Sequence, residues 1–143
     1  MKKIVLILLC TVFTLSSAAQ QNHPQRFSPE KFQQELEQYV VSEAKLTPQE
    51  SAKFLPIFAE MHQKQRAVYK KQRDLWKANL SDESVCRNVV KQNDELDIEL
   101  KKLQQQYHEK FLNVIPASKV LSVIHAENRF HREQLKKWGR HKR

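Results

Sequence analysis

The sequence predicts an all-α fold with one short, two long and one medium-length helix. Apolar residues recur at alternating steps of three and four over long stretches, which places them along one side of a helix, as in coiled coils. The chain contains a single glycine, and no alternating apolar pattern follows residue 19, which argues against strands and tight hairpins. Helices this long need neighbours along their length, so we expect a homodimer that forms along a helix seam.

The first long helix is predicted within residues 46–80. Thr47 and Glu50 form a T-x-x-E capping box, and Pro48 suits the first helical position. The helix would span about 30 residues and roughly 45 Å. Its seam consists of Phe54, Phe58, Met61, Gln65, Val68, Gln72 and Leu75. Pro56 is expected to kink the helix. The two glutamines of the seam are interpreted as lying where the seam is thin and in contact with water, rather than as part of a polar network.

A short helix is predicted before it. Ser28 caps this helix, Pro29 is its first residue, and Phe27 is expected to pack on Phe32 as a hydrophobic staple. The helix is expected to end near Lys45. Its apolar face consists of Phe32, Leu36, Tyr39 and Val40.

Two further helices are predicted after residue 80. Ser81, Asp82 and Glu83 place acidic groups at the positive end of the third helix. Its seam consists of Cys86, Val89, Asn93, Leu96, Leu100, Leu103, Tyr107 and Phe111. A fourth helix follows Pro116, from about Ala117 to Trp138, and Gly139 is expected to end it.

The N-terminus has the features of a cleaved signal peptide. Lys2 and Lys3 precede an apolar run that is too short to span a membrane, and the small residues that follow predict cleavage after Ala19. Loss of these two lysines would change the net charge from +9 to +7. The predicted organisation is a signal peptide (1–19), a disordered segment (20–27), a helical domain (28–138) and a basic tail (139–143).

Cleavage would leave Cys86 as the only cysteine, so no intramolecular disulfide is expected. Cys86 stands at an apolar position beside Val85 and Val89, which favours a buried small hydrophobe. An intermolecular disulfide is the alternative, because an unpaired cysteine in an exported protein can join two chains.

Basic residues form one strip on each of two predicted helices. The strips are Arg66, Lys70, Arg73 and Lys77 on the second helix, and Arg129, Arg132, Lys136 and Arg140 on the fourth. The first and third helices are rich in acidic residues. One interpretation is ordinary solvated helix faces. The other is a basic surface, bordered by apolar groups, that attracts unfolded or acidic polypeptide or contacts an anionic membrane. Export argues against nucleic acid as the partner.

The sequence offers little that indicates chemistry. No glycine-rich phosphate loop, CxxC motif or local nucleophile–base arrangement is present, so we predict neither catalysis nor a cofactor. The best titratable pair is Glu127 and His131, four residues apart, which usually form a local ion pair or hydrogen bond. A zinc, copper or nickel site that adds His62 or His108 is the alternative, although no H-x-x-x-H spacing supports it.

Two short motifs resemble those of a known family. Leu46, Thr47, Pro48, Gln49 and Glu50 (LTPQE) look like the LTxxQ motif of the Spy/CpxP family of periplasmic helical proteins, with Glu50 at the family's glutamine. Ile115, Pro116 and Lys119 belong to a degenerate second copy, IPASK, with Lys119 at the glutamine. The runs FLPIFAEMHQKQR and AENRFHREQL resemble a subgroup described as sensors linked to extracytoplasmic sigma factors.

The resemblance implies a hooked α-hairpin of four helices, dimerisation, and a location in the periplasm of a Gram-negative bacterium. It implies an ATP-independent chaperone, an accessory regulator of envelope-stress or sigma-factor signalling, or a heavy-metal responsive protein. The metal-binding members use histidine-rich motifs that this chain lacks. We therefore predict a non-catalytic periplasmic chaperone that captures unfolded clients on the two basic strips. The alternative is a regulator that docks on the exported domain of a stress sensor.

Overall fold

The computed structural model describes residues 28–140, apart from the side chains of Trp138 and Arg140. This part contains α1 (Pro29–Glu43), α2 (Pro48–Leu75), α3 (Glu83–Leu112) and α4 (Ala117–Arg140), and no strand. The prediction of an all-α fold is confirmed. No helix in these residues combines the length and the apolar character that crossing a membrane requires. The predicted signal peptide, the segment 20–27 and the staple from Phe27 lie outside the described residues.

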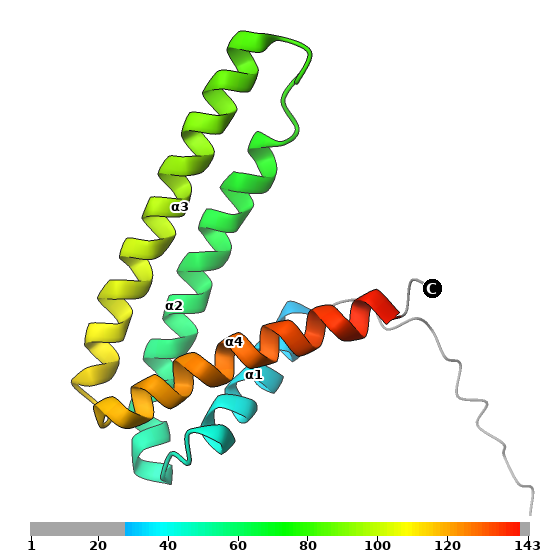
Figure 1. Cartoon of the computed structure of the whole chain (residues 1–143). Helices are drawn as coiled ribbons and strands as arrows, with labels where there is room; N and C mark the ends of the chain where they lie inside the picture. The colour runs from blue at the N-terminus through cyan, green and yellow to red at the C-terminus, as the bar shows by residue number, and fades with distance from the viewer. Residues whose placement is uncertain (1–27, 141–143) are drawn as a thin grey trace, which may run out of the picture.

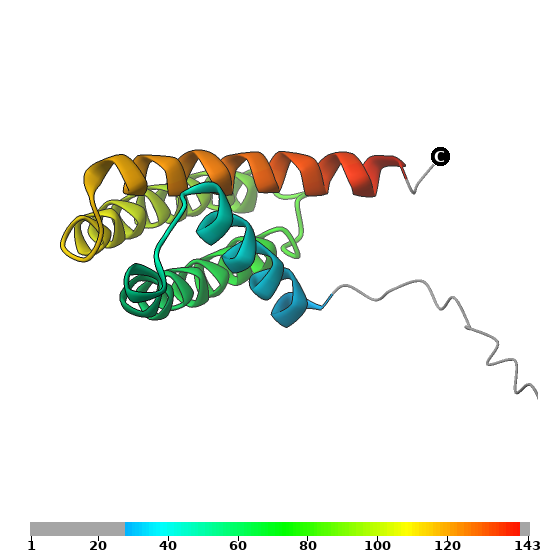
Figure 2. The ribbon, with the colours of Figure 1, turned by 90° about the horizontal axis from the view of Figure 1, so that it is seen from below.

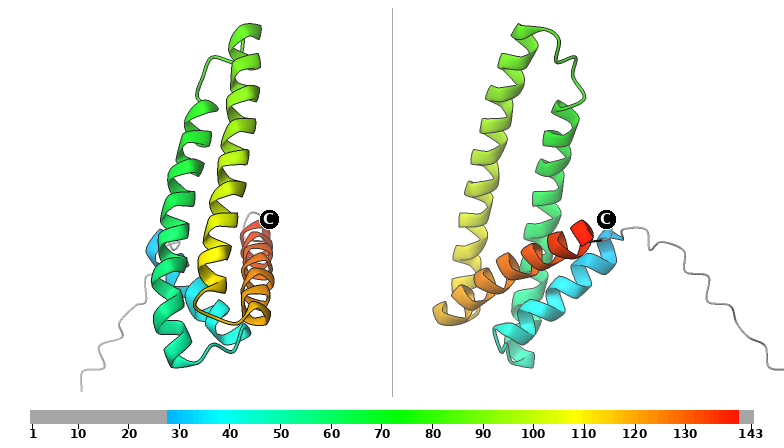
Figure 3. Two further views of the ribbon diagram at one scale, coloured as in Figure 1. Left: turned by 90° about the vertical axis from the view of Figure 1, so that its left-hand side faces the viewer. Right: turned by 45° about the vertical axis from the view of Figure 1, so that its right-hand side comes forward.

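The four helices form a hooked hairpin. The long helices α2 and α3 run side by side in opposite directions, and they are connected at the far end of the hairpin (Figure 1). The shorter pair, α1 and α4, crosses the other end of this hairpin (Figures 1 and 2). Figure 3 shows that α1 and α4 project together to one side of α2. The molecule therefore has an inner angle between α2 and the α1–α4 pair.

The predicted N-terminal caps are present. The Ser28 hydroxyl accepts a hydrogen bond from the Lys31 amide. The Thr47 hydroxyl accepts one from the Glu50 amide, and the Glu50 carboxylate accepts one from the Thr47 amide at 2.7 Å, which completes the capping box. Beyond this cap, α2 runs without interruption through Pro56.

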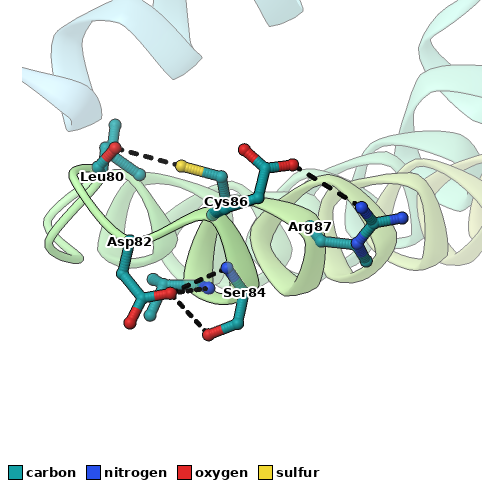
Figure 4. A network of polar contacts seen from close by, with 7 residues as sticks. Leu80, Asp82, Ser84, Cys86 and Arg87 are labelled. Carbon is teal, nitrogen blue, oxygen red and sulfur yellow. Dashed lines mark hydrogen bonds and ion pairs between the residues drawn. The ribbon is translucent and has the colours of Figure 1, made fainter.

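The α2–α3 connection ends in the cap of α3 (Figure 4). One oxygen of the Asp82 carboxylate accepts hydrogen bonds from the Ser84 and Val85 amides, which satisfies two of the free N–H groups at the start of the helix. The Cys86 thiol points back toward the Leu80 carbonyl oxygen, 3.1 Å away. Cys86 is half-buried, so the prediction of a buried side chain is wrong. The physical reason is that α2 ends at Leu75, so the first turn of α3 has no helix packed along it.

The core lies where the α1–α4 pair crosses the hairpin. The seams predicted for α1, α2 and α3 face inward, and α4 adds Val120, Val123, Ala126 and Phe130. The Phe54 ring lies 4.8 Å from the Phe111 ring, and Phe58 lies 5.1 Å from Phe54, measured between ring centroids. Phe130 of α4 contacts Phe32 and Tyr39 of α1. Most of the buried apolar surface is therefore at one end of the molecule.

The distant half of the hairpin has a mixed seam. Val68, Val89 and Leu100 are buried there, and the Gln72 amide donates hydrogen bonds to Asp97 at 2.7 Å and to Asn93 at 3.5 Å. The interpretation of this stretch as a wet seam without a polar network is wrong for Gln72. Gln65 is 4% exposed, so it does not lie in a wet part of the seam either. The network satisfies polar groups that the four–three spacing places between the two helices.

Helix α4 continues through Gly139 to Arg140. The prediction that Gly139 ends the helix is therefore wrong. A glycine ends a helix when it adopts a positive φ, and Gly139 does not adopt one.

Candidate functional site

A groove of about 770 Å³ occupies the inner angle of the hook. It is formed by the start of α1, the second half of α2 and one residue of α4. Eleven residues line it: Pro29, Phe32, Gln33, His62, Gln65, Arg66, Tyr69, Gln72, Arg73, Trp76 and His131. We call this feature the elbow groove.

The elbow groove divides the basic strip predicted on α2. Arg66 and Arg73 line the groove, and Arg66 donates a hydrogen bond to the Gln33 side chain of α1 at 3.1 Å. Lys70 and Lys77 do not line it; both are exposed and pair with Asp74, at 3.1 and 2.6 Å, and Lys77 lies just past the end of the helix. Arginine and lysine therefore have different surroundings here, although the sequence places them on one strip.

Two aromatic side chains alternate with the arginines along α2. Tyr69 is 45% exposed and Trp76 is 60% exposed, and both line the elbow groove. The order Arg66, Tyr69, Arg73, Trp76 follows steps of three, four and three, which keeps all four on one side of the helix. Tyr69 and Trp76 are not among the binding residues predicted from the sequence. The same three–four spacing that indicated the apolar seam also places these two aromatics beside the arginines, and it was the available signal.

The inner end of the groove holds two histidines that share one carboxylate. His62 Nε2 lies 3.4 Å from Glu127 Oε1, and His131 Nε2 lies 3.7 Å from the same oxygen. His62 is 8% exposed, and its ring packs edge-on against Phe58 at 4.4 Å. Burial lowers the pKa of His62, and the nearby His131 and Arg66 act in the same direction, whereas Glu127 opposes the change. Burial of His62 therefore favours its uncharged form.

The pair predicted from the sequence, Glu127 and His131, is thus joined by His62 and not by His108. Among residues 28–140 no group of three or more His, Cys, Asp or Glu side chains has an arrangement that could hold a metal ion. His108 contacts Phe111 at 6.0 Å between ring centroids. The described residues give the heavy-metal alternative no site.

The basic strip predicted on α4 lies elsewhere. Arg129 pairs with Glu43 of α1 at 2.7 Å, and Arg129 and Arg132 line a small separate pocket with His125 and Asn128. Lys136 is exposed, and the side chain of Arg140 is not described. Arg129, Arg132 and Lys136 do not line the elbow groove, so the described members of the two predicted strips do not form one pocket.

The two motif copies meet at the opposite end of the core. Lys119 Nζ lies 2.5 Å from the Glu50 carboxylate and donates a second hydrogen bond to the Lys45 carbonyl at 3.1 Å. The hydrogen bonds from Lys119 and from the Thr47 amide lower the pKa of Glu50. Leu46 and Ile115 are buried, whereas Pro48, Gln49 and Pro116 are exposed. The two residues that replace the family's glutamines therefore form an ion pair that ties the start of α2 to the start of α4.

Comparison of the chain with protein-family models, with curated proteins and with solved structures finds no significant match. The resemblance to the Spy/CpxP family therefore stays a prediction that rests on two short motifs. The hooked four-helix fold is consistent with it, but a fold alone does not define a function.

Proposed function

We propose that this protein is a non-catalytic chaperone of the Spy/CpxP type, which captures unfolded polypeptides in the periplasm without ATP. The observation that carries the proposal is the alternation of arginines and exposed aromatics along α2 on the inner side of the hook. Arg66 and Arg73 attract acidic segments over a distance, while Tyr69 and Trp76 offer apolar surface to a segment that has not yet buried its own.

Release follows from the same chemistry. A client that folds withdraws its apolar side chains from Tyr69 and Trp76, and the remaining attraction to the arginines is a surface interaction that salt screens. No nucleotide or bound metal is required for this cycle.

Suppression of aggregation tests the proposal. The chain from Gln20 onward, which contains all four helices, is mixed with a chemically denatured client on dilution, and light scattering is followed at low and at high salt. We expect suppression that weakens as salt rises. The variant Arg66→Gln/Arg73→Gln should lose most of the suppression, because both side chains line the groove.

The matched control is Lys70→Gln/Lys77→Gln, which removes the same charge from the end of α2 and the turn after it, outside the groove. Equal losses in the two double variants would show that net charge alone attracts the client. No suppression by the unaltered protein at either salt concentration would refute the chaperone proposal. The regulator of envelope-stress signalling, which predicts a single saturable partner among envelope proteins, would then be the better proposal.

A further inference from the structure

We propose that the elbow groove also binds a small amphipathic anion, a medium-chain carboxylate, with its headgroup beside Arg66 and its chain along Tyr69 and Trp76. This site goes beyond the chaperone proposal and does not depend on it, because the groove has features that a client surface does not require.

The first feature is size. A stable protein–protein interface takes roughly 20–30 residues on each side, whereas small-molecule sites are hollows of about 300–1,000 Å³. The elbow groove has a volume of about 770 Å³ and eleven lining residues. Taken by itself, it has the dimensions of a site for one small ligand.

The second feature is the apolar lining along α2. Tyr69 and Trp76 lie on the same side of the helix, and Phe32 and Pro29 of α1 face them across the groove. Large aromatic side chains that stay exposed next to one another mark a surface that binds an apolar group. An aliphatic chain that lies along α2 would cover both exposed rings.

The third feature is the closed inner end of the groove. His62 lines this end, is 8% exposed, and its Nε2 lies 3.4 Å from Glu127 Oε1. A carboxylate headgroup placed there would meet the Glu127 carboxylate, and like charges repel. The headgroup therefore lies further along the groove, beside Arg66.

The fourth feature is the charge along the rest of the groove. Arg66 lies one helical turn from His62 and lines the same groove, and its planar guanidinium fits a carboxylate. The acidic group nearest to His62 is Glu127 of α4, which does not line the groove and whose Oε1 lies between His62 and His131. Arg73 adds a second positive group further along α2. The groove therefore favours an anion over a cation of the same shape.

Calorimetric titration tests this proposal without any client protein. Dodecanoate, kept below the concentration at which it forms micelles, is titrated into the chain from Gln20 onward, and Trp76 fluorescence is recorded in parallel. We expect one bound dodecanoate per chain. Dodecyltrimethylammonium, with the same chain length and the opposite charge, should bind at least about 10-fold more weakly.

Variants then locate the site. Arg66→Gln should weaken dodecanoate binding about 10-fold or more, whereas Lys70→Gln, one turn further along α2 but outside the groove, should leave it unchanged. Circular dichroism checks that both variants stay folded. The proposal is overturned if the unaltered protein does not bind dodecanoate, if the cationic detergent binds equally well, or if the two variants behave alike. None of these results would bear on aggregation suppression.

Discussion

Replacement of Phe58 by alanine tests whether the core at the crossing of the helices holds the hook together. Phe58 is fully buried, and its ring lies 4.4 Å from His62, 5.1 Å from Phe54 and 6.1 Å from Phe111. A fully buried Phe→Ala replacement removes about 3–5 kcal/mol from the free energy of unfolding, through lost burial and the cavity that remains. A domain of this size has about 5–15 kcal/mol in total, so the loss is a large fraction.

Urea unfolding followed by far-ultraviolet circular dichroism measures this loss. With a denaturant slope of about 1.5 kcal/mol per molar, the midpoint should fall by roughly 2–3 M. The matched control is Val90→Ala on α3, whose side chain is 61% exposed and whose replacement should cost less than about 0.5 kcal/mol. A Phe58→Ala loss below about 1 kcal/mol at an unchanged slope would refute the packing described for this core.

Three further predictions concern other parts of the molecule. Because burial lowers the pKa of His62 in the folded protein, the unfolded chain binds more protons than the folded chain as the pH falls below about 6.5, and the free energy of unfolding decreases. In His62→Gln the urea midpoint should therefore change less between pH 7 and pH 5 than in the unaltered protein. An equal change in the two proteins would contradict the burial of this ring. Lys45 has a φ of 50°, so Lys45→Gly should leave the melting temperature unchanged or raise it, whereas Lys45→Val should lower the free energy of unfolding by about 1–2 kcal/mol. Equal melting temperatures for the glycine and valine variants would argue against this backbone conformation. The half-buried Cys86 thiol should react with a small thiol reagent in the folded protein, and a reaction as slow as global unfolding would show that it is buried.

The sequence was sufficient to predict which residues face inward and where most helices begin. The apolar spacing identified Phe54, Phe58 and Phe111 as seam residues because a helix repeats every 3.6 residues whatever it packs against. The caps at Ser28 and Thr47 were predicted because they depend on neighbours within four positions, whereas Asp82, the cap of α3, was predicted only as part of an acidic helix start. The end of α4 was harder to predict, because the helix continues past Gly139 although glycine has a low helix propensity.

The elbow groove could be predicted only in part. Periodicity does not reveal which helices are partners, so nothing in the sequence indicated that α1 packs on α4 and that Phe32 faces the aromatics of α2. The ion pair between Glu50 and Lys119 joins positions 69 residues apart. Each residue departs from the LTxxQ pattern that the sequence resembles. The opposite charges of Glu50 and Lys119 were the available signal that they meet.

The pairing of α1 with α4 imposes an order on folding. The α2–α3 hairpin joins helices that follow one another, so its contacts form soon after both segments are available. Helix α1 precedes them in the chain, yet its main packing partner is the last helix. We therefore expect α1 to stay unpaired until α4 has been synthesised. Until then Leu36 and Val40, which are fully buried in the finished protein, face solvent.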